Sequence, residues 1–364
     1  MLNIPPEEKS ELDTYLTEAA RILRKYTETE KLKDFESIEL EVRKQMVEVV
    51  APQIGGFFFS AKGEKQTGKT RKVKTIIGEI KIGRKQAKKL GLEEKVAISP
   101  NLRKCCLRAC AKTSYQQAEE DLGELMGIKV GHSTLHRLVE RVELPLSQTQ
   151  VVSEGVSLDG GKICLRGKNQ EGGQWRDYKL VSLHDNICEA FFQDAQALLD
   201  WSAAQPLSPI LTCLGDGHDG IWNLIEKLGQ HQVSIKREVL DWYHLKENLY
   251  KVGGSLKRLE KVEFFLWHGW VDAAIAEFDG LNNQRSHNFQ SYLKKHRQRI
   301  PCYKQYQQLG IPIGSGDVES KIKQVGARVK LSGARWNRES VPLILRLRCA
   351  YLNRSPLLSI YAQS

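Results

Sequence analysis

Hydrophobic residues recur at helical spacing through the first part of the chain. Between residues 7 and 50, apolar side chains follow one another three or four positions apart, which predicts two amphipathic helices. Residues 114–126 predict another helix that breaks at Gly127, and Ser133 is placed to cap a helix ending near Glu143. Two short helices joined by such a turn are typical of a helix-turn-helix, whose second helix would enter the DNA major groove. A helical hairpin that only packs against the rest of the protein has the same pattern.

The pattern changes near Val156, where short alternating runs replace the helical spacing. Residues 156–192 predict three antiparallel strands. The following segments predict a helix, a strand, a helix and a further strand, and residues 245–300 are helical without strand features. This order predicts an α/β fold with a mixed sheet, interrupted by an all-helical insertion and preceded by an α-helical N-terminal region.

Length and composition exclude several classes of protein. The 364 residues suffice for two or three domains, and no apolar run reaches the ~18 residues of a membrane-spanning helix. The acidic, polar N-terminus is unlike a secretory signal. The eight cysteines are scattered without a CxxC pair, which is typical of reduced thiols in a cytoplasmic protein.

The charge of the chain is concentrated in one segment. The net charge is +11, and residues 60–112 alone carry 16 basic and 4 acidic residues. Because this segment opens with Gly, Thr and Lys and has few apolar residues, we expect an exposed arm or linker. It is either a solvated linker or an arm that contacts DNA phosphates. Residues 113–156 have a net charge of −4, which argues against strong phosphate contact by the helix-turn-helix.

Three acidic residues stand out by their positions in the predicted strands and helices. Asp159 lies in the first strand before two glycines, Asp216 lies just beyond the fourth strand between glycines, and Glu319 begins a helix after GSG. If the first and fourth strands are parallel neighbours, the three carboxylates converge at one sheet edge. Such a set can hold two Mg²⁺ ions for phosphodiester cleavage and strand transfer. Taken singly, each acid is more typical of a turn or a helix cap, and it is the three together that favour a metal site.

Four segments resemble a known family. SLDGGK, GDGHDGIWNL, VLDWYH and IPIGSGDVESKIKQVGARVKLSGARWNRE are similar to the ISKra-type bacterial insertion-sequence transposases. These belong to the mutator-like DDE transposases, which have a ribonuclease-H-like core. The resemblance covers about residues 90–354, and the C-terminal block is its most specific part.

The resemblance implies roles for individual residues. Asp159, Asp216 and Glu319 would be the catalytic, metal-binding acids, acting with two Mg²⁺ ions or with Mn²⁺ in their place. Asp219 is an alternative to Asp216. Asp241 and His244 match the family's [C/D]-x-x-H signature. His244 would touch DNA or the metal-bound water, or it would hydrogen-bond Asp241 in a supporting role, which we favour.

The basic residues after Glu319 are candidates for DNA binding. A helix beside the metal ions would direct some of these cations at phosphates, and others would be ordinary solvated charge. Trp336 among them would stack on an unpaired base or belong to the core, and we favour the core. The candidates are Lys321, Lys323, Arg328, Lys330, Arg335, Trp336 and Arg338.

The resemblance and the patterns together predict the domain organisation. The expected parts are an N-terminal helical region (1–59), a basic arm or linker (60–112), a helix-turn-helix region (113–150), a ribonuclease-H-like catalytic domain (151–244 and 311–354) and a helical insertion (245–310).

The expected function is that of a DDE transposase, a polynucleotidyl transferase that binds element ends and cuts and joins DNA. Its partners would be element-end and target DNA and further copies of the chain in a synaptic complex, in the cytoplasm and on the nucleoid, with no membrane involved. Many members of the family carry a cysteine-rich, zinc-ribbon-like segment that this chain lacks. The alternative is therefore a catalytically inactive or internally deleted, transposase-derived DNA-binding protein. A nuclease without a joining step is a third reading.

Overall fold

The computed structural model describes residues 3–62, 69–93, 96–167, 172–184 and 186–361. The chain forms two compact units. The first comprises residues 1–109 and 115–135, and the second comprises residues 110–114 and 136–364. In the described part of the chain, no helix is long and apolar enough to cross a membrane.

The first unit begins with helices, as the spacing of apolar residues predicts. They are α1 (Pro6–Lys25), the 3-10 turn η1 (Thr29–Leu32), α2 (Phe35–Gln45), the π-helical turn η2 (Met46–Val50) and α3 (Ala51–Lys62). Asp34 starts α2 by accepting a hydrogen bond from the Ser37 N–H at 2.8 Å. None of the residues of α1 and α2 is buried.

The basic segment 60–112 is largely folded, which corrects the expectation of an arm or linker. Strands β1 (Thr70–Thr75) and β2 (Gly78–Gly83) form an antiparallel hairpin followed by α4 (Arg84–Lys89). Val73, Ile82 and Ala87 form a small core. The lysines alternate with these buried residues on the strands, so the segment is polar in composition and still has an apolar face. The first part of the expected arm, residues 63–68, lies outside the described residues.

Three helices follow α4: α5 (Pro100–Lys112), α6 (Tyr115–Met126) and α7 (His132–Arg141). The two helices predicted on either side of Gly127 are confirmed as α6 and α7. Gly127 adopts a φ of +67°, which ends α6 without strain. Glu119 of α6 accepts a hydrogen bond from the His132 N–H at 2.6 Å and so joins the start of α7 to α6.

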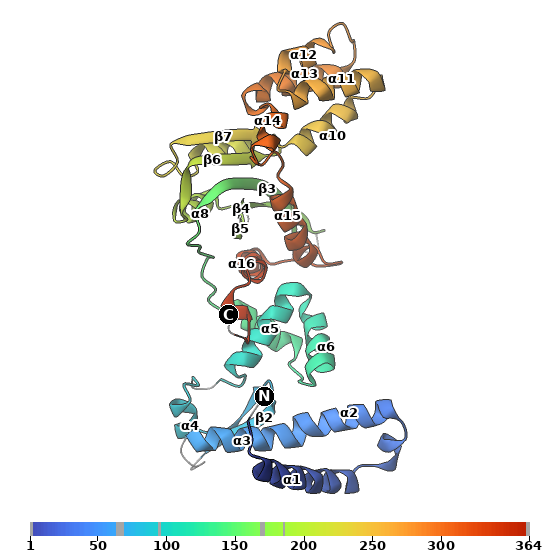
Figure 1. Cartoon of the computed structure of the whole chain (residues 1–364), viewed down its shortest axis with the longest axis vertical. Coiled ribbons are helices and arrows are strands. Elements are labelled where there is room, and N and C mark those ends of the chain that lie inside the picture. Colours follow the sequence, from blue (N-terminus) through green and yellow to red (C-terminus); the bar gives the residue numbers. More distant parts are fainter. Residues whose placement is uncertain (1–2, 63–68, 94–95, 168–171, 185, 362–364) are drawn as a thin grey trace. The chain divides into compact units, whose positions relative to one another are not determined.

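The second unit contains a five-stranded mixed sheet, so the α/β class is confirmed. Its strands are β3 (Ser153–Leu165), β4 (Gln174–Leu183), β5 (Cys188–Phe191), β6 (Leu207–Gly215) and β7 (Ile235–Leu240). Their spatial order is β5-β4-β3-β6-β7 (Figure 1). Strands β3, β6 and β7 are parallel, and β4 is antiparallel to both β3 and β5. The first and fourth strands are therefore parallel neighbours, as expected.

Helices surround this sheet and bury its apolar side chains. They are α8 (Ala195–Ala203), α9 (Asp219–Lys227), α15 (Gly316–Val329) and α16 (Val341–Leu352). Val156 and Leu158 of β3 and Leu211 of β6 are fully buried in the main core. Helix α15 packs on β3 and β4. The short turns η4 (Arg338–Ser340) and η5 (Pro356–Leu358) flank α16.

The segment between β7 and α15 is helical, as its pattern predicts. It contains α10 (Trp242–Val252), α11 (Leu256–Trp267), α12 (Val271–Ala276), α13 (Gln284–His296), η3 (Arg297–Arg299) and α14 (Tyr303–Gln308) (Figure 1). Trp242 packs against Trp267 and Tyr303, with ring centroids 4.8 and 4.9 Å away. This aromatic cluster fixes the start of α10 against the other helices of the insertion.

Candidate metal centre

Asp159 is positioned by the middle of β3, where the strand pairs with β4. Its backbone lies opposite Leu180, and its Oδ1 accepts a hydrogen bond from the Gly160 N–H at 2.5 Å. The second position must be glycine for a steric reason: a Cβ at Gly161 would overlap the ring of Tyr178 on β4. The GG pair therefore lets a large aromatic side chain close over the strand beside Asp159.

Asp216 stands immediately after β6, the parallel neighbour of β3. Its Oδ1 accepts a hydrogen bond from the His218 N–H at 3.0 Å, which shapes the loop. Gly217 has a φ of +93°, and a Cβ there would lie 2.7 Å from the Tyr292 hydroxyl. Both the backbone conformation and the close approach of α13 thus require glycine.

Glu319 lies in the first turn of α15 and points toward α10. The neighbouring Val318 is fully buried and anchors the helix. Asp317 accepts a short hydrogen bond from Ser182 of β4, which ties the helix start to the sheet. A carboxylate in the first turn is also favoured by the helix dipole.

Asp241 connects the two segments that carry the remaining site residues. It is fully buried at the end of β7, and its Oδ1 caps α10 by accepting the His244 N–H at 2.7 Å. Its Oδ2 accepts hydrogen bonds from the Ser315 hydroxyl, at 2.6 Å, and from the Ser315 N–H. One buried carboxylate therefore holds the start of α10 to the turn before α15, which carries Glu319.

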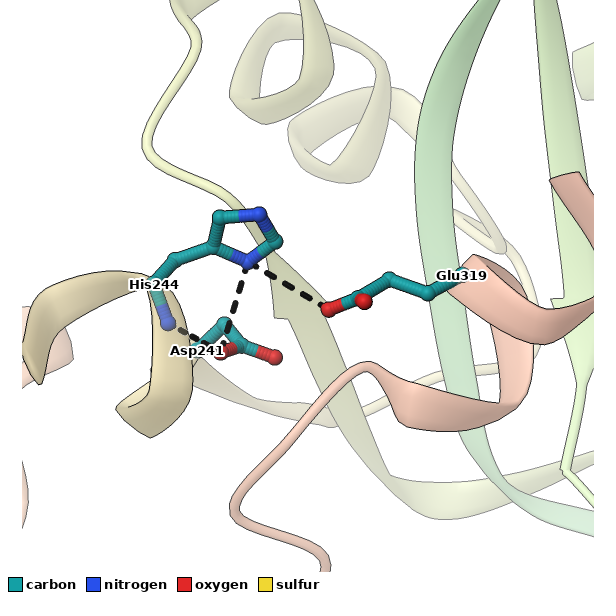
Figure 2. Close-up of side chains that lie close together, drawn as sticks. All are labelled: Asp241, His244 and Glu319. Carbon is teal, nitrogen blue, oxygen red and sulfur yellow. Dashed lines mark hydrogen bonds and ion pairs between the residues drawn. The ribbon is translucent and has the colours of Figure 1, made fainter. Parts of the chain in front are cut away.

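His244 lies between two carboxylates. Its Nδ1 is 3.4 Å from Asp241 Oδ1 and 3.5 Å from Glu319 Oε1, and Figure 2 shows all three side chains facing one another. The Asp241 carboxylate, followed by the charges of Glu319 and Asp216, raises the pKa of His244 to about 9 against the opposing effect of burial. The imidazole is therefore protonated at neutral pH, and a histidine must be neutral to ligate a metal.

The three predicted acids share one electrostatic environment. Burial raises the pKa of Asp159 most strongly, and the negative charges of Asp216 and Glu319 raise it further. The hydrogen bond from Gly160 and the charge of His244 act in the opposite direction. A bound cation would offset this repulsion between carboxylates.

The closest group of possible metal ligands differs from the predicted one. Asp241, His244 and Glu319 each offer an atom, and these atoms all lie within 4.8 Å of one another. This Asp-His-Glu group could hold a metal ion, with His244 giving up its proton to serve as a ligand. Among the described residues no such compact group includes Asp159 or Asp216. The sequence placed Asp241 and His244 in a supporting role. The D-x-x-H spacing at a helix start was the feature of the sequence that could have indicated a shared site for Asp241 and His244.

Asp219, the alternative to Asp216, lies away from this group. It is exposed and pairs with Lys295 of α13 at 2.5 Å. The ion pair and the neighbouring positive charges lower its pKa. Asp219 therefore links α9 to the insertion, and Asp216 is the acid whose charge reaches Asp159 and His244.

The predicted DNA-binding residues divide by exposure. Lys323, Lys330, Arg335 and Arg338 are exposed, and Lys321 is half-buried. Lys323 Nζ lies 3.7 Å from Glu319 Oε2. Arg338 donates a short hydrogen bond to Gln193 and lies over the Phe192 ring.

Arg328 and Trp336 are buried, which corrects the assignment of Arg328 to DNA and agrees with the core interpretation favoured for Trp336. Only 1% of Arg328 is exposed, its Nε donates to the Cys110 carbonyl at 2.6 Å, and its guanidinium lies over the Trp336 ring. The Trp336 indole donates to the Val329 carbonyl at 2.9 Å. Both side chains hold α15 to its neighbours and are buried away from solvent.

Comparison of the chain with known proteins found no relatives. The chain matches no known family in a search of protein families, and no curated protein matches it.

Proposed function

We propose that the protein is a DDE-type transposase that binds the ends of a mobile element and catalyses metal-dependent cleavage and joining of DNA strands. The observation that carries the proposal is that the negative charges of Asp216, just after β6, and of Glu319 on α15 both raise the pKa of Asp159 on β3. The resemblance of the surrounding motifs to ISKra-type transposases supports the same function.

The sheet is compatible with a ribonuclease-H-like core. Its order places the first three strands as an antiparallel meander and adds the fourth and fifth strands in parallel beside the first. The insertion of 245–310 falls between the fifth strand and the helix that carries Glu319.

The donor set suits a hard cation. Asp159, Asp216 and Glu319 offer only carboxylate oxygens, which Mg²⁺ prefers, and Mn²⁺ accepts the same ligands. Two such ions, held by these three residues, would stabilise the entering and leaving oxygens of a phosphoryl displacement. A water or a DNA 3′-hydroxyl would attack phosphorus as the bond to the leaving 3′ oxygen breaks. The proton lost by the nucleophile passes to solvent, and the leaving 3′ oxygen takes up a proton from solvent to become a hydroxyl.

Asp241 and His244 would orient the catalytic glutamate. The protonated imidazole holds the Glu319 carboxylate from one side, while Asp241 fixes both helix starts. In this role His244 supplies positive charge among the acids and Asp241 keeps it in place.

The test is strand cleavage with a matched pair of variants. A plasmid carrying the DNA that flanks the protein's gene is incubated with the full chain and Mg²⁺ or Mn²⁺. Glu319→Gln is expected to lose cleavage and joining by about a thousandfold or more while DNA binding persists. Asp219→Asn is the control, because Asp219 is exposed and paired with Lys295. Unchanged cleavage by Glu319→Gln would refute the assignment.

One observation favours a second candidate, a transposase-derived DNA-binding protein without catalysis. Asp159 and Asp216 stand outside the compact Asp241–His244–Glu319 group. Specific binding to the flanking DNA without cleavage in either metal would select this function.

A further inference from the structure

Helices α1 and α2 of the first unit have apolar stripes that are exposed to solvent. On α1, Leu12, Leu16, Ala19 and Leu23 follow one another at spacings of four, three and four residues, which is the spacing of a coiled-coil seam. Leu12 and Leu16 are 41% and 51% exposed. A second stripe on α2 and η2 has residues between 40% and 82% exposed, namely Phe35, Ile38, Val42, Met46 and Val49.

Polar contacts join α2 to the turn that follows α1. Gln45 donates a hydrogen bond to the Thr27 hydroxyl at 2.7 Å, and Lys31 Nζ lies 3.7 Å from Glu41 Oε2. Every residue of α1 and α2 is at least partly exposed. Helices in proteins gain most of their stability from packing an apolar face against another element. Both stripes therefore lack the packing that would stabilise their helices.

The charges of α1 make the helix complementary to a second copy of itself. Its first turn contains Glu7 and Glu8, and its last turn contains Arg24 and Lys25. Helix α2 also has an acidic first turn and a basic last turn. Each arrangement is favoured by the helix dipole. When two copies of α1 lie antiparallel, the acidic start of each faces the basic end of the other, whereas a parallel pair would bring like charges together.

The apolar residues of α1 match in the same antiparallel arrangement. With Leu16 of one helix opposite Ala19 of the other, Leu12 lies opposite Leu23, and each pair occurs twice by symmetry. Such an interface uses the same surface on both copies and closes at two. A helix of 20 residues is about 30 Å long. The stripe of α2 adds further apolar surface toward the roughly 800 Å² per partner of a standard interface.

We propose that two copies of the chain pair through the stripes of α1 and α2, with each α1 antiparallel to the α1 of the other copy. The self-complementary charge and apolar pattern identify the occupant of the stripes as a second copy. This pairing needs neither DNA nor metal. It therefore goes beyond the proposed function and does not rest on it.

Sedimentation of the full chain tests the proposal. The protein is treated with nuclease and EDTA, so that bound DNA and metal cannot hold copies together. At micromolar concentration the wild type is expected to sediment with twice the mass of one chain. A wild type that stays monomeric, because another segment or another protein covers the stripes, would overturn the proposal.

Matched variants locate the interface. Leu12→Glu with Leu16→Glu is expected to weaken dimerisation about a hundredfold or more, because two apolar side chains per copy lose their burial. Val42→Glu with Met46→Glu should act in the same way. Thr14→Glu with Thr17→Glu adds the same charge on the opposite, exposed face of α1 and should leave the dimer intact. Thermal unfolding checks that the variants are folded, and a dimer that persists in either folded stripe variant would contradict the role of that helix.

Charge reversal tests the antiparallel arrangement without altering the stripes. Glu7→Lys with Glu8→Lys, or Arg24→Glu with Lys25→Glu, is expected to weaken the dimer about threefold or more, because like charges then meet. The chain that carries all four changes should regain the affinity of the wild type. Each reversal opposes the helix dipole, so greater helix stability cannot explain this recovery. A fourfold variant weaker than both pairs would overturn the antiparallel pairing.

Discussion

Asp241 holds together the two segments that carry His244 and Glu319. Its carboxylate is fully buried and accepts hydrogen bonds from both the start of α10 and Ser315. Burial alone would raise its pKa, but the hydrogen bonds from His244 and Ser315 outweigh burial and lower it. Asp241 is therefore charged and keeps His244 charged, and this pair sets the position of Glu319.

Glu189 gives a pH prediction away from the site. It is buried on β5, and its Oε2 accepts a hydrogen bond from the Ser147 N–H at 3.1 Å. Burial raises its pKa to about 7 from the ordinary 4.5. The folded state therefore binds more protons than the unfolded state between these values, and the free energy of unfolding falls as the pH rises through them.

The expected loss is at most about 3 kcal/mol between about pH 4.5 and about pH 7, with no further change from this group above that range. Glu189→Gln should lack this component. Urea unfolding of both proteins at about pH 5 and about pH 8 measures the difference. Identical pH dependence in the two proteins would contradict the raised pKa.

At the scale of elements, the two glycines after Asp159 make different demands. A Cβ at Gly161 would meet the Tyr178 ring, whereas a Cβ at Gly160 would meet the flexible end of Lys179 at 3.0 Å. Gly161→Ala is expected to destabilise the protein by about 1–3 kcal/mol, as overpacking does. Gly160→Ala should cost under about 1 kcal/mol, because the lysine can move. Denaturant unfolding ranks them, and equal costs would refute the steric reason for the GG pair.

The C-terminal basic residues also separate into two kinds at this scale. Arg328→Ala removes a buried hydrogen bond to Cys110 and is expected to cost about 2–4 kcal/mol of stability. The exposed Lys330 should instead contribute to DNA binding. Lys330→Ala is expected to change the free energy of unfolding by less than about 0.5 kcal/mol. It is also expected to lower the slope of log affinity for DNA against log salt concentration by about 1. Denaturant unfolding and DNA binding measured at several salt concentrations distinguish the two variants. If Arg328→Ala kept its stability and weakened DNA binding, Arg328 would instead be a DNA-binding residue.

Across the whole molecule, the sequence predicts most of the helices and strands and the order of the strands in the sheet. It does not predict which charged side chains are buried by contacts between distant parts of the chain. The strand order and the helical insertion follow from alternation and spacing, and they place β3 beside β6. The D-x-x-H spacing indicates that Asp241 meets His244. The buried place of Arg328 could not be predicted, because its partner Cys110 lies 218 residues away. The β1–β2 hairpin escaped detection because its lysines alternate with the buried residues of each strand.

The central claim is that Asp159 and Asp216, although outside the compact group of three, bind metal together with Glu319. Titration of the full chain with Mn²⁺, followed by electron paramagnetic resonance of the free ion, measures this most directly. Asp159→Asn, Asp216→Asn and Glu319→Gln are each expected to weaken Mn²⁺ binding about tenfold or more, with Asp219→Asn unchanged. Wild-type Mn²⁺ affinity in Asp159→Asn and Asp216→Asn, with loss only in Glu319→Gln, would contradict the account.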